Sequence, residues 1–412
     1  MLKKVDKTLF FLFATFFVGY FAIACYGPYA NLYFKQQGIS TATIGFLSSI
    51  MPVASILIQP LWARAADKTG KKHLILSIIL LGSGITVLLF PLGKGVVFFA
   101  IILFCFAVFQ TSMFSMQNAV TLQIAEKRGY HFSNIRIAGT LGYAVGILLL
   151  NNLITGNLAL AFITCGISTF VTLIVHMVGV PKENTVPASS AGGGKEKKGG
   201  TLEVLKNKQV ILLMLMLWCV YLSCSFQGAF IGLTIVDLGH SASYVGVCVF
   251  LCCISELPVL IFANRLIQKF GEMPLIIFSG ILMTFRMMLI STGVLWVILV
   301  MMALQGIGYM LNFYCGSTLI HRLMPDHLKA RGQSLIFLVQ AGLGSVIGNM
   351  GGGLIAERIG FLNTFRLMGG VTFGVTLLVM VVSLLDRGKK KPVPRETVAV
   401  EEAVVEEQPI SV

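Results

Sequence analysis

The sequence predicts an all-α membrane protein in which twelve transmembrane helices form two pseudo-symmetric six-helix bundles. Three observations favour this fold class. The 412 residues are 56% hydrophobic and only 12% charged, whereas soluble domains carry roughly 25% charged residues. The apolar residues gather in runs of about 20, the length that crosses a bilayer as a helix. The second half of the sequence also repeats features of the first.

Twelve apolar runs follow one another along the chain, with a mean hydropathy of +0.87 over the whole sequence. Backbone groups in lipid must satisfy one another, so continuous runs of this length indicate helices. We expect these spans at residues 8–34, 41–65, 72–92, 96–124, 132–154, 157–180, 209–236, 242–268, 273–292, 294–323, 330–357 and 363–385.

The net charge of +14 indicates topology rather than a nucleic-acid partner. Most Lys and Arg residues lie on the side of the two termini, and only four lie in loops on the other side: Lys35, Lys94, Arg358 and Arg366. By the positive-inside rule, both termini are then cytoplasmic. We expect a multi-pass monomer of the cytoplasmic (inner) membrane, whose partners are the lipid bilayer and a small-molecule substrate, without nucleic acid.

One long hydrophilic segment divides the spans six and six. Its Gly, Ser, Pro and Lys content is typical of a flexible linker, and the end of the chain turns from basic to acidic, as disordered tails do. The predicted organisation is an N-terminal six-helix bundle at 1–180, a cytoplasmic linker at 181–208, a C-terminal six-helix bundle at 209–387 and a disordered cytoplasmic tail at 388–412.

The two halves share a sequence pattern at an offset of 201 residues. "QGISTATIGFLSS" (37–49) matches "LGHSASYVGVCVF" (238–250), and the same offset carries "RAADKTG" (64–70) onto "RLIQKFG" (265–271). The matched pairs include Gly45 with Gly246 and Gly70 with Gly271. Duplicated halves with a binding site between them are typical of secondary transporters.

The motif "RAADKTGKK" lies in the loop between the second and third spans. Its Asp accepts hydrogen bonds and its Gly makes the turn, so the motif is either a solvated turn or a conformational latch used in one access state. We favour the latch, formed by Arg64, Asp67, Lys68 and Gly70. The second copy has Gln268 where the first has Asp67, which confines a charged latch to the first half.

These features resemble the major facilitator superfamily. "YFAIACYGPYANLYFKQQGIS", "QPLWARAADKTG" and "RIAGTLGYAVG" look like stretches of its lactose-permease-like group, and "SELPVL" and "RLMPDHLKARGQSL" look like the wider group of oligosaccharide, nucleoside and aromatic-acid proton symporters. The resemblance covers nearly the whole chain outside the linker and the tail. It implies the major facilitator fold and proton-coupled transport.

The resemblance also implies roles for particular residues. Arg136 falls where the lactose permeases have their substrate-binding arginine, and Tyr143 falls where they have the aromatic ring that stacks on the sugar. Arg286 falls where they have an arginine that takes part in proton coupling. Glu256 lies within about a turn of a span-eight glutamate of the permease. Other acids of the permease are absent, and polar residues stand near their places: Gln117 and Asn118, Ser225, and Tyr309 and Asn312.

Glu256 alone among 17 acidic residues falls well inside a span, and Arg136 and Arg286 are the only basic residues that do. Buried charges are costly and normally have partners. Glu256 and Arg286 each lie 15 residues from Gly271, so at a rise of 1.5 Å per residue they reach similar depth on adjacent helices. We predict a desolvated pair that couples transport to protons; a static structural bridge and direct contact of Glu256 with substrate are the alternatives.

Arg136 then remains without a predicted partner. It shares a helix face with Gly139, Tyr143 and Gly146, which suggests a binding wall, although an arginine near the start of a span also snorkels to the surface. If Arg136 and Arg286 oppose Glu256, the cavity carries a charge of +1. The substrate is then either an anion such as a carboxylate, or a neutral polyhydroxy compound whose hydroxyls accept hydrogen bonds from the guanidinium.

Other polar residues in the spans are candidates to line the same cavity. The polar residues of span four recur at helical spacing and so share one helix face, as do those of span ten. In span one, two tyrosines flank Pro28. Polar stripes in membranes serve packing about as often as ligand binding. We include Asn118, Tyr26, Tyr29, Tyr309 and Asn312 with Arg136 and Tyr143 in the predicted substrate site.

The sequence contains no pattern for an enzyme or an ATP-driven pump. A P-loop, a nucleophile with an activating base, and metal spacing among the nine cysteines are all absent, so we expect no cofactor and no metal. We predict a proton-coupled transporter of a small polar or anionic solute (sugar, nucleoside or organic acid) that works by alternating access. The alternatives are an uncoupled facilitator or efflux transporter, and a membrane receptor or sensor on the same scaffold.

Overall fold

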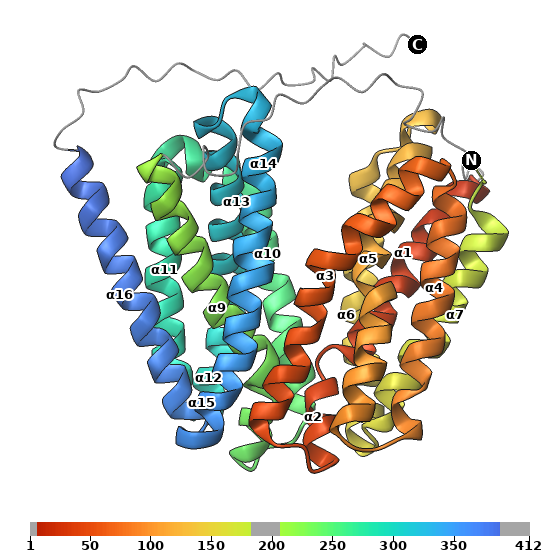
Figure 1. Cartoon of the computed structure of the whole chain (residues 1–412), viewed down its shortest axis with the longest axis horizontal. Helices are drawn as coiled ribbons and strands as arrows, with labels where there is room; N and C mark the ends of the chain where they lie inside the picture. The colour runs from red at the N-terminus through yellow and green to blue at the C-terminus, as the bar shows by residue number, and fades with distance from the viewer. Residues whose placement is uncertain (1–5, 183–206, 388–412) are drawn as a thin grey trace, which may run out of the picture.

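The computed structural model describes residues 6–182 and 207–387. These residues form helices and connecting turns without strands, arranged as two bundles side by side (Figure 1). The first bundle contains α1 (Lys7–Tyr26), α2 (Ala30–Gln36), α3 (Thr41–Thr69), α4 (Lys72–Leu88), the 3₁₀ turn η1 (Phe90–Leu92), α5 (Val96–Arg128), α6 (Phe132–Gly156) and α7 (Ala159–Gly179).

The second bundle has the same number of spans but more interruptions. It contains α9 (Lys208–Asp237), α10 (Ser243–Phe270), α11 (Glu272–Ile290), α12 (Leu295–Ala303), α13 (Gln305–Leu323), α14 (Asp326–Phe337), the π-helical segments η3 (Leu338–Gly344) and η4 (Ile347–Gly351), α15 (Gly352–Ile359) and α16 (Phe361–Arg387).

The predicted spans agree closely with these helices. Among the described residues, ten helices are long and apolar enough to cross a membrane, or eleven when the two parts of the bent α10 count as one span. The remaining span is α6, whose apolar part, Asn134–Leu149, is shorter. Most of the predicted linker and all of the predicted tail lie outside the described residues.

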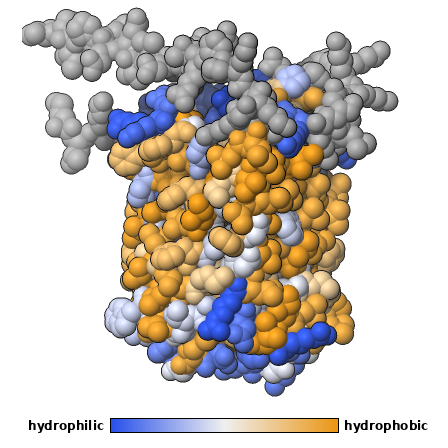
Figure 2. All heavy atoms as spheres, turned by 90° about the vertical axis from the view of Figure 1, so that its left-hand side faces the viewer, coloured by the Kyte–Doolittle hydropathy of each residue, from blue (hydrophilic) through white to orange (hydrophobic). Residues whose placement is uncertain are grey.

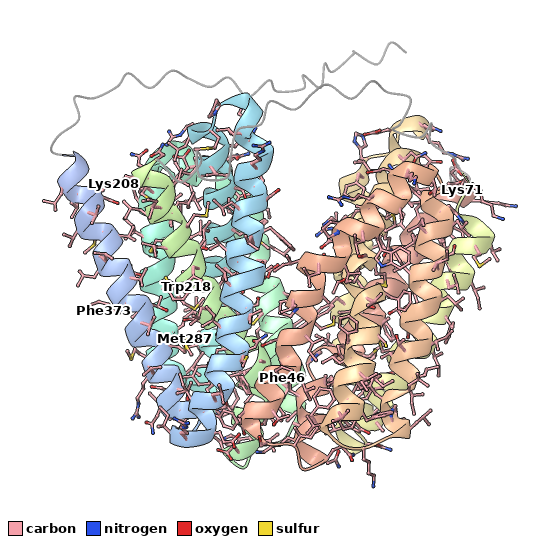
Figure 3. All side chains as sticks on the ribbon, in the orientation of Figure 1. Phe46, Lys71, Lys208, Trp218, Met287 and Phe373 are labelled. Carbon is pink, nitrogen blue, oxygen red and sulfur yellow. The ribbon has the colours of Figure 1, made fainter. Side chains whose placement is uncertain are left out.

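The surface has the polarity of a multi-pass membrane protein. Figure 2 shows an apolar band between two more polar ends, and the large exposed side chain of Phe373 (53% exposed), which Figure 3 places between the two ends, belongs to it. Figure 3 shows Lys71 and Lys208 at the end of the molecule where α1 begins and α16 ends. We call this the terminal end and the opposite one the far end.

Span one is broken because its sequence cannot continue an α-helix through Pro28. Proline lacks the backbone N–H that the helix needs, and α1 ends at Tyr26 before α2 resumes at Ala30. Span eleven changes to π-helix within a run of small residues, "GLGSVIGNMGGG". Its glycines at 344, 348 and 352 pack against α9. The small residues of this run therefore let α9 approach the span closely.

The two bundles meet at the far end and separate toward the terminal end (Figure 1). Contacts between them join α3 to α15 and η4, α6 to α10, and α2 to α9. Gly45 of α3 and Gly246 of α10, which the repeat equates, both lie at these crossings. A Cβ at Gly45 would meet Asn349 and Gly353, and one at Gly246 would meet Asn151 and Tyr29.

Candidate functional site

Glu256 lies in the middle of α10, next to a bend. The Ser243–Val259 and Ile261–Phe270 parts of the helix differ in direction by 55°, and Pro258 explains the bend because it cannot donate a backbone hydrogen bond. The Glu256 side chain is half-buried. Among residues 6–182 and 207–387, the carboxylate has no hydrogen-bond or ion-pair partner.

One tyrosine from each bundle lies within electrostatic range of this carboxylate. Tyr143 of α6 and Tyr309 of α13 both lie close enough to Glu256 for an electrostatic interaction. The Tyr309 ring contacts Tyr221 at a centroid distance of 5.9 Å and stacks on Phe313 at 6.3 Å. The structure therefore brings together three of the residues predicted for the site: Glu256, Tyr143 and Tyr309.

Arg286 is sequestered from this group. Its side chain is 0% exposed, and its guanidinium donates to the Met301 carbonyl at 2.6 Å and to Oε1 of Gln227 at 2.8 Å and of Gln305 at 3.3 Å. The predicted ion pair with Glu256 is not formed in this structure. Neutral amide oxygens and a backbone carbonyl solvate the buried cation in place of the carboxylate.

The Arg286 network still reaches the helix that carries Glu256. Gln227 donates to Gln305, and Cys252, one turn before Glu256, donates through Sγ to Gln305 Oε1 at 3.1 Å. The chain of contacts thus runs from α11 through α9 and α13 to α10. Arg286 fixes the packing of these four helices around the acid without touching it.

Arg136 lies nearer the terminal end of α6 and is exposed. Its Nη1 contacts the Tyr20 hydroxyl of α1 at 3.4 Å. The glycines on its helix face serve helix packing rather than ligand access, because a Cβ at Gly139 would meet Tyr20 and one at Gly146 would meet Ala24 and Phe21. This face of α6 is mainly the contact surface for α1.

The predicted asparagines occupy different environments. Asn312 is 1% exposed and donates to Ser279 of α11 at 3.2 Å, so in this structure it joins two helices, and its role in substrate binding stays a prediction. Asn118 of α5 is half-buried, and its Oδ1 is buried without a hydrogen-bond partner in the described chain. Asn118 therefore remains a candidate ligand.

The two tyrosines around Pro28 also differ. Tyr29 is 0% exposed and donates to Asn151 Oδ1 at 2.7 Å, so in this structure it joins α6, and its role in substrate binding stays a prediction. Tyr26 lines a cavity of about 250 Å³ between the bundles, toward the far end. The other lining residues are Gly27, Ala30, Asn31, Phe34, Ser48, Met51, Leu103, Ser225, Gly228, Ala229 and Asn349.

Hydrogen bonds between the bundles close the far end. Asn31 donates to the Ala229 carbonyl at 2.8 Å, Asn349 to the Ser48 carbonyl at 3.1 Å, and Asn151 to the Ser243 carbonyl at 2.7 Å. These amides were not among the predicted site residues. Each is an uncharged amide within an apolar span, the same sequence feature that pointed to candidate residues in spans four and ten.

The predicted latch lies at the other end of α3. Gly70 has φ of 67° and ends the helix, with its N–H donating to Ala66, as a left-handed C-terminal glycine does. Arg64, Asp67 and Lys68 are exposed. The turn predicted at Gly70 is confirmed, whereas the latch itself stays a prediction for an access state in which the terminal ends approach each other.

A sequence model described as the MFS_1 like family matches residues 9–367. The chain is 25% identical over 376 residues to the "Uncharacterized transporter YwbF" of Bacillus subtilis (strain 168), covering 90% of this chain and 92% of that protein. It is 24% identical to the "Maltose permease" of Geobacillus stearothermophilus, covering 93% and 95%, and 22% identical to the "Probable 3-phenylpropionic acid transporter" of Escherichia coli (strain K12), covering 92% and 96%.

The fold has a close counterpart among solved structures. The crystal structure of the nucleoside transporter NupG superposes with a TM-score of 0.81 at 14% sequence identity, covering 92% of this chain and 99% of the other. The matched family spans nearly all of the described helices, from α1 into α16. The chain therefore belongs to the MFS_1 like family and is a membrane transporter of the major facilitator superfamily rather than an enzyme.

Proposed function

We propose that this chain is a proton-coupled secondary transporter that moves a small polar solute across the cytoplasmic membrane by alternating access. The protein acts as a monomer with both termini in the cytoplasm, so the structure corresponds to an inward-facing state. One observation carries the proposal: Glu256 is a half-buried carboxylate at the bundle interface without a cation partner among the described residues. Such a group binds or releases a proton as its exposure to water changes.

The sequestration of Arg286 bears on the choice of solute. An anionic substrate was expected only if Arg136 and Arg286 together gave the cavity a net positive charge against Glu256. Arg286, however, is fully buried against neutral acceptors. The charged groups that remain are Arg136 toward the terminal end and Glu256 at mid-depth. We therefore favour a neutral polyhydroxylated solute, bound by Glu256, Tyr143, Tyr309 and Asn118, over an organic anion. Relatives named for maltose and nucleosides support this class.

The experiment compares wild type, Glu256→Gln and Glu126→Gln in proteoliposomes, with maltose as the probe. Glu126 is exposed near the terminal end of α5 and is the matched acid outside the interface. We expect Glu256→Gln to lose uphill accumulation driven by an imposed proton gradient while it keeps counterflow. Glu126→Gln behaves as wild type. Uphill accumulation by Glu256→Gln would disprove coupling through this acid.

Counterflow also separates the proposal from its alternatives. An uncoupled facilitator or efflux transporter shows counterflow in wild type without any response to the proton gradient. A receptor or sensor on this scaffold shows no counterflow with any probe. Three probes cover the solute classes: maltose, uridine and 3-phenylpropionate.

A further inference from the structure

Exposed cations gather at the terminal end of the three helices α3, α6 and α10. They are Arg64 and Lys68 of α3, Arg136 of α6, and Arg265 and Lys269 of α10. None of them has an ion-pair partner among residues 6–182 and 207–387. We call these five residues the basic rim. With the exposed Asp67 beside them, five cations and one acid give a formal charge of +4.

The basic rim belongs to both bundles. α3 and α6 are helices of the first bundle and α10 of the second. α6 contacts α10, and α3 contacts span eleven, whereas the bundles separate toward the terminal end (Figure 1). Like charges repel one another, so the rim favours an anionic partner. A partner that contacts both sides of the rim lies across the opening between the bundles.

The chain itself contains an anionic segment of suitable charge. Residues 396–407, "ETVAVEEAVVEE", include five glutamates and no Lys or Arg. This segment is part of the predicted tail and lies outside the described residues. Its five negative charges complement the +4 of the basic rim, and complementary charge selects partners and speeds their encounter.

The segment is close enough along the chain to reach the basic rim. α16 ends at Arg387, at the terminal end. It packs on α9, which packs on span eleven, the neighbour of α3. Packed helices lie about 8–10 Å apart, so the two steps from α16 to span eleven cross about 20 Å. The chain from residue 387 to residue 396 extends up to about 30 Å.

The order of charges along the tail favours the protein over the membrane as partner of the glutamates. "KKKPVPR" (389–395) carries four cations and directly follows α16, whose Phe373 faces lipid. Anionic headgroups of the cytoplasmic leaflet attract such a basic stretch and repel the glutamates that come after it. The basic rim then remains as the cationic surface within reach of the glutamates.

We propose that residues 396–407 bind the basic rim and restrict the passage of solute through the terminal-end opening. The binding does not depend on transport, whereas its effect on flux rests on the proposed function. Exposed ion pairs are individually weak and are screened by salt, but a tethered segment binds at high effective concentration. The tail is therefore a reversible restraint that high ionic strength releases.

Carbodiimide cross-linking tests the contact in full-length protein in phosphatidylcholine nanodiscs. The reagent joins a carboxylate directly to an adjacent amine, and mass spectrometry identifies the joined peptides. We expect links from 396–407 to Lys68 and Lys269, and none to Lys94, an exposed lysine of the far end. Absence of links to both rim lysines overturns the proposal. Replacement of the five glutamates by glutamine is the control and should abolish the links.

Anionic lipid is the rival occupant of the basic rim. Adding phosphatidylglycerol to the nanodiscs places it in direct competition with the tail. We expect the links to Lys68 and Lys269 to persist. Their loss would show that lipid headgroups occupy the rim and would overturn the tail as its partner.

Maltose counterflow in phosphatidylcholine proteoliposomes measures the effect on flux. The contact is removed from one side by replacing the five glutamates with glutamine, and from the other by Arg265→Gln with Lys269→Gln. Each change should raise the initial rate about threefold, since weak pairs act at high effective concentration. Combining them should add nothing further. Lys94→Gln, which removes an exposed cation of the far end, should match wild type.

The two measurements separate this proposal from the proposed function. Links to the rim without counterflow in wild type overturn transport and leave the docking standing. Counterflow without links to the rim overturns the docking. Equal rates in wild type and both variants overturn the restraint on flux, and in these last two cases the transport proposal stands.

Discussion

Gly45 of α3 and Gly353 of α15 face each other across the interface between the bundles: a Cβ on Gly45 would lie 3.0 Å from the Cα of Gly353, and one on Gly353 would lie 2.9 Å from the Cα of Gly45. Side chains larger than hydrogen have no room at this crossing. The closed far end therefore depends on both residues being glycine.

A larger side chain at Gly45 should keep the far end from closing. Overpacking costs roughly 1–3 kcal/mol, so we expect Gly45→Leu to reduce maltose counterflow by about tenfold while the protein remains folded. Counterflow in proteoliposomes measures the effect, with Gly374→Leu as the control. Wild-type flux in Gly45→Leu would show that this crossing opens and closes without direct helix contact.

Removing the buried guanidinium should destabilise the second bundle. Arg286→Leu leaves Gln227 Oε1 without its donor, at roughly 1–3 kcal/mol for a buried unpaired acceptor, whereas Gln305 Oε1 keeps Gln227 and Cys252 as donors. We expect a fall of several degrees in the Tm of purified protein. Arg265→Leu, which removes an exposed arginine of α10, should change it little. An unchanged Tm in Arg286→Leu would contradict the network described above.

Glu357 of α15 accepts a hydrogen bond at 2.6 Å from the backbone N–H of Ala42, in the first turn of α3. The carboxylate thus caps a helix of the other bundle. In Glu357→Ala, the amide of Ala42 should exchange with deuterium faster than in wild type, as measured by mass spectrometry of peptides covering 40–47. Arg358→Ala, which changes the neighbouring exposed residue, should leave this rate unaltered.

Asp6 should make stability depend on pH at the terminal end. The Tyr130 hydroxyl and the Thr8 N–H donate to its carboxylate and hold the pKa of Asp6 below its usual range. A lowered pKa in the folded state stabilises the fold above the unfolded-state pKa, and this contribution is lost as pH falls through the folded value. The Tm of wild type should exceed that of Asp6→Asn near neutral pH, and the difference should vanish in strong acid. A difference that is constant with pH would refute this role.

The positions of the helices followed from the sequence because hydropathy and helix length depend on local composition. Both breaks that were missed have local causes as well. Pro28 interrupts span one, and the small residues of span eleven permit a π-helix against α9. The repeat also predicted a real equivalence, since Gly45 and Gly246 lie at corresponding crossings of the bundles.

The pairing of Glu256 with Arg286 failed for a different reason. Helix rise gives the depth of a residue, but the rotation of each helix decides which neighbour it faces, and the sequence spacing of two residues on separate helices leaves that rotation open. Gln227 and Gln305 also compete for the guanidinium, and neither is near Arg286 in sequence. The roles of the far-end asparagines could not be predicted because they bond to backbone carbonyls. Every residue has such a carbonyl, so no residue type in the sequence identifies the partner.

The bonds that close the far end determine how this closure responds to dissolved salt. Asn31, Asn151 and Asn349 all donate to backbone carbonyls, and no ion pair joins the two bundles in the described part of the chain. Dissolved salt screens attraction between charged groups but leaves neutral hydrogen bonds and glycine contacts nearly untouched. The neutral part of this gate is therefore insensitive to salt, whereas the charged Glu357 carboxylate, which accepts from Ala42 of the other bundle, is a contact that salt weakens.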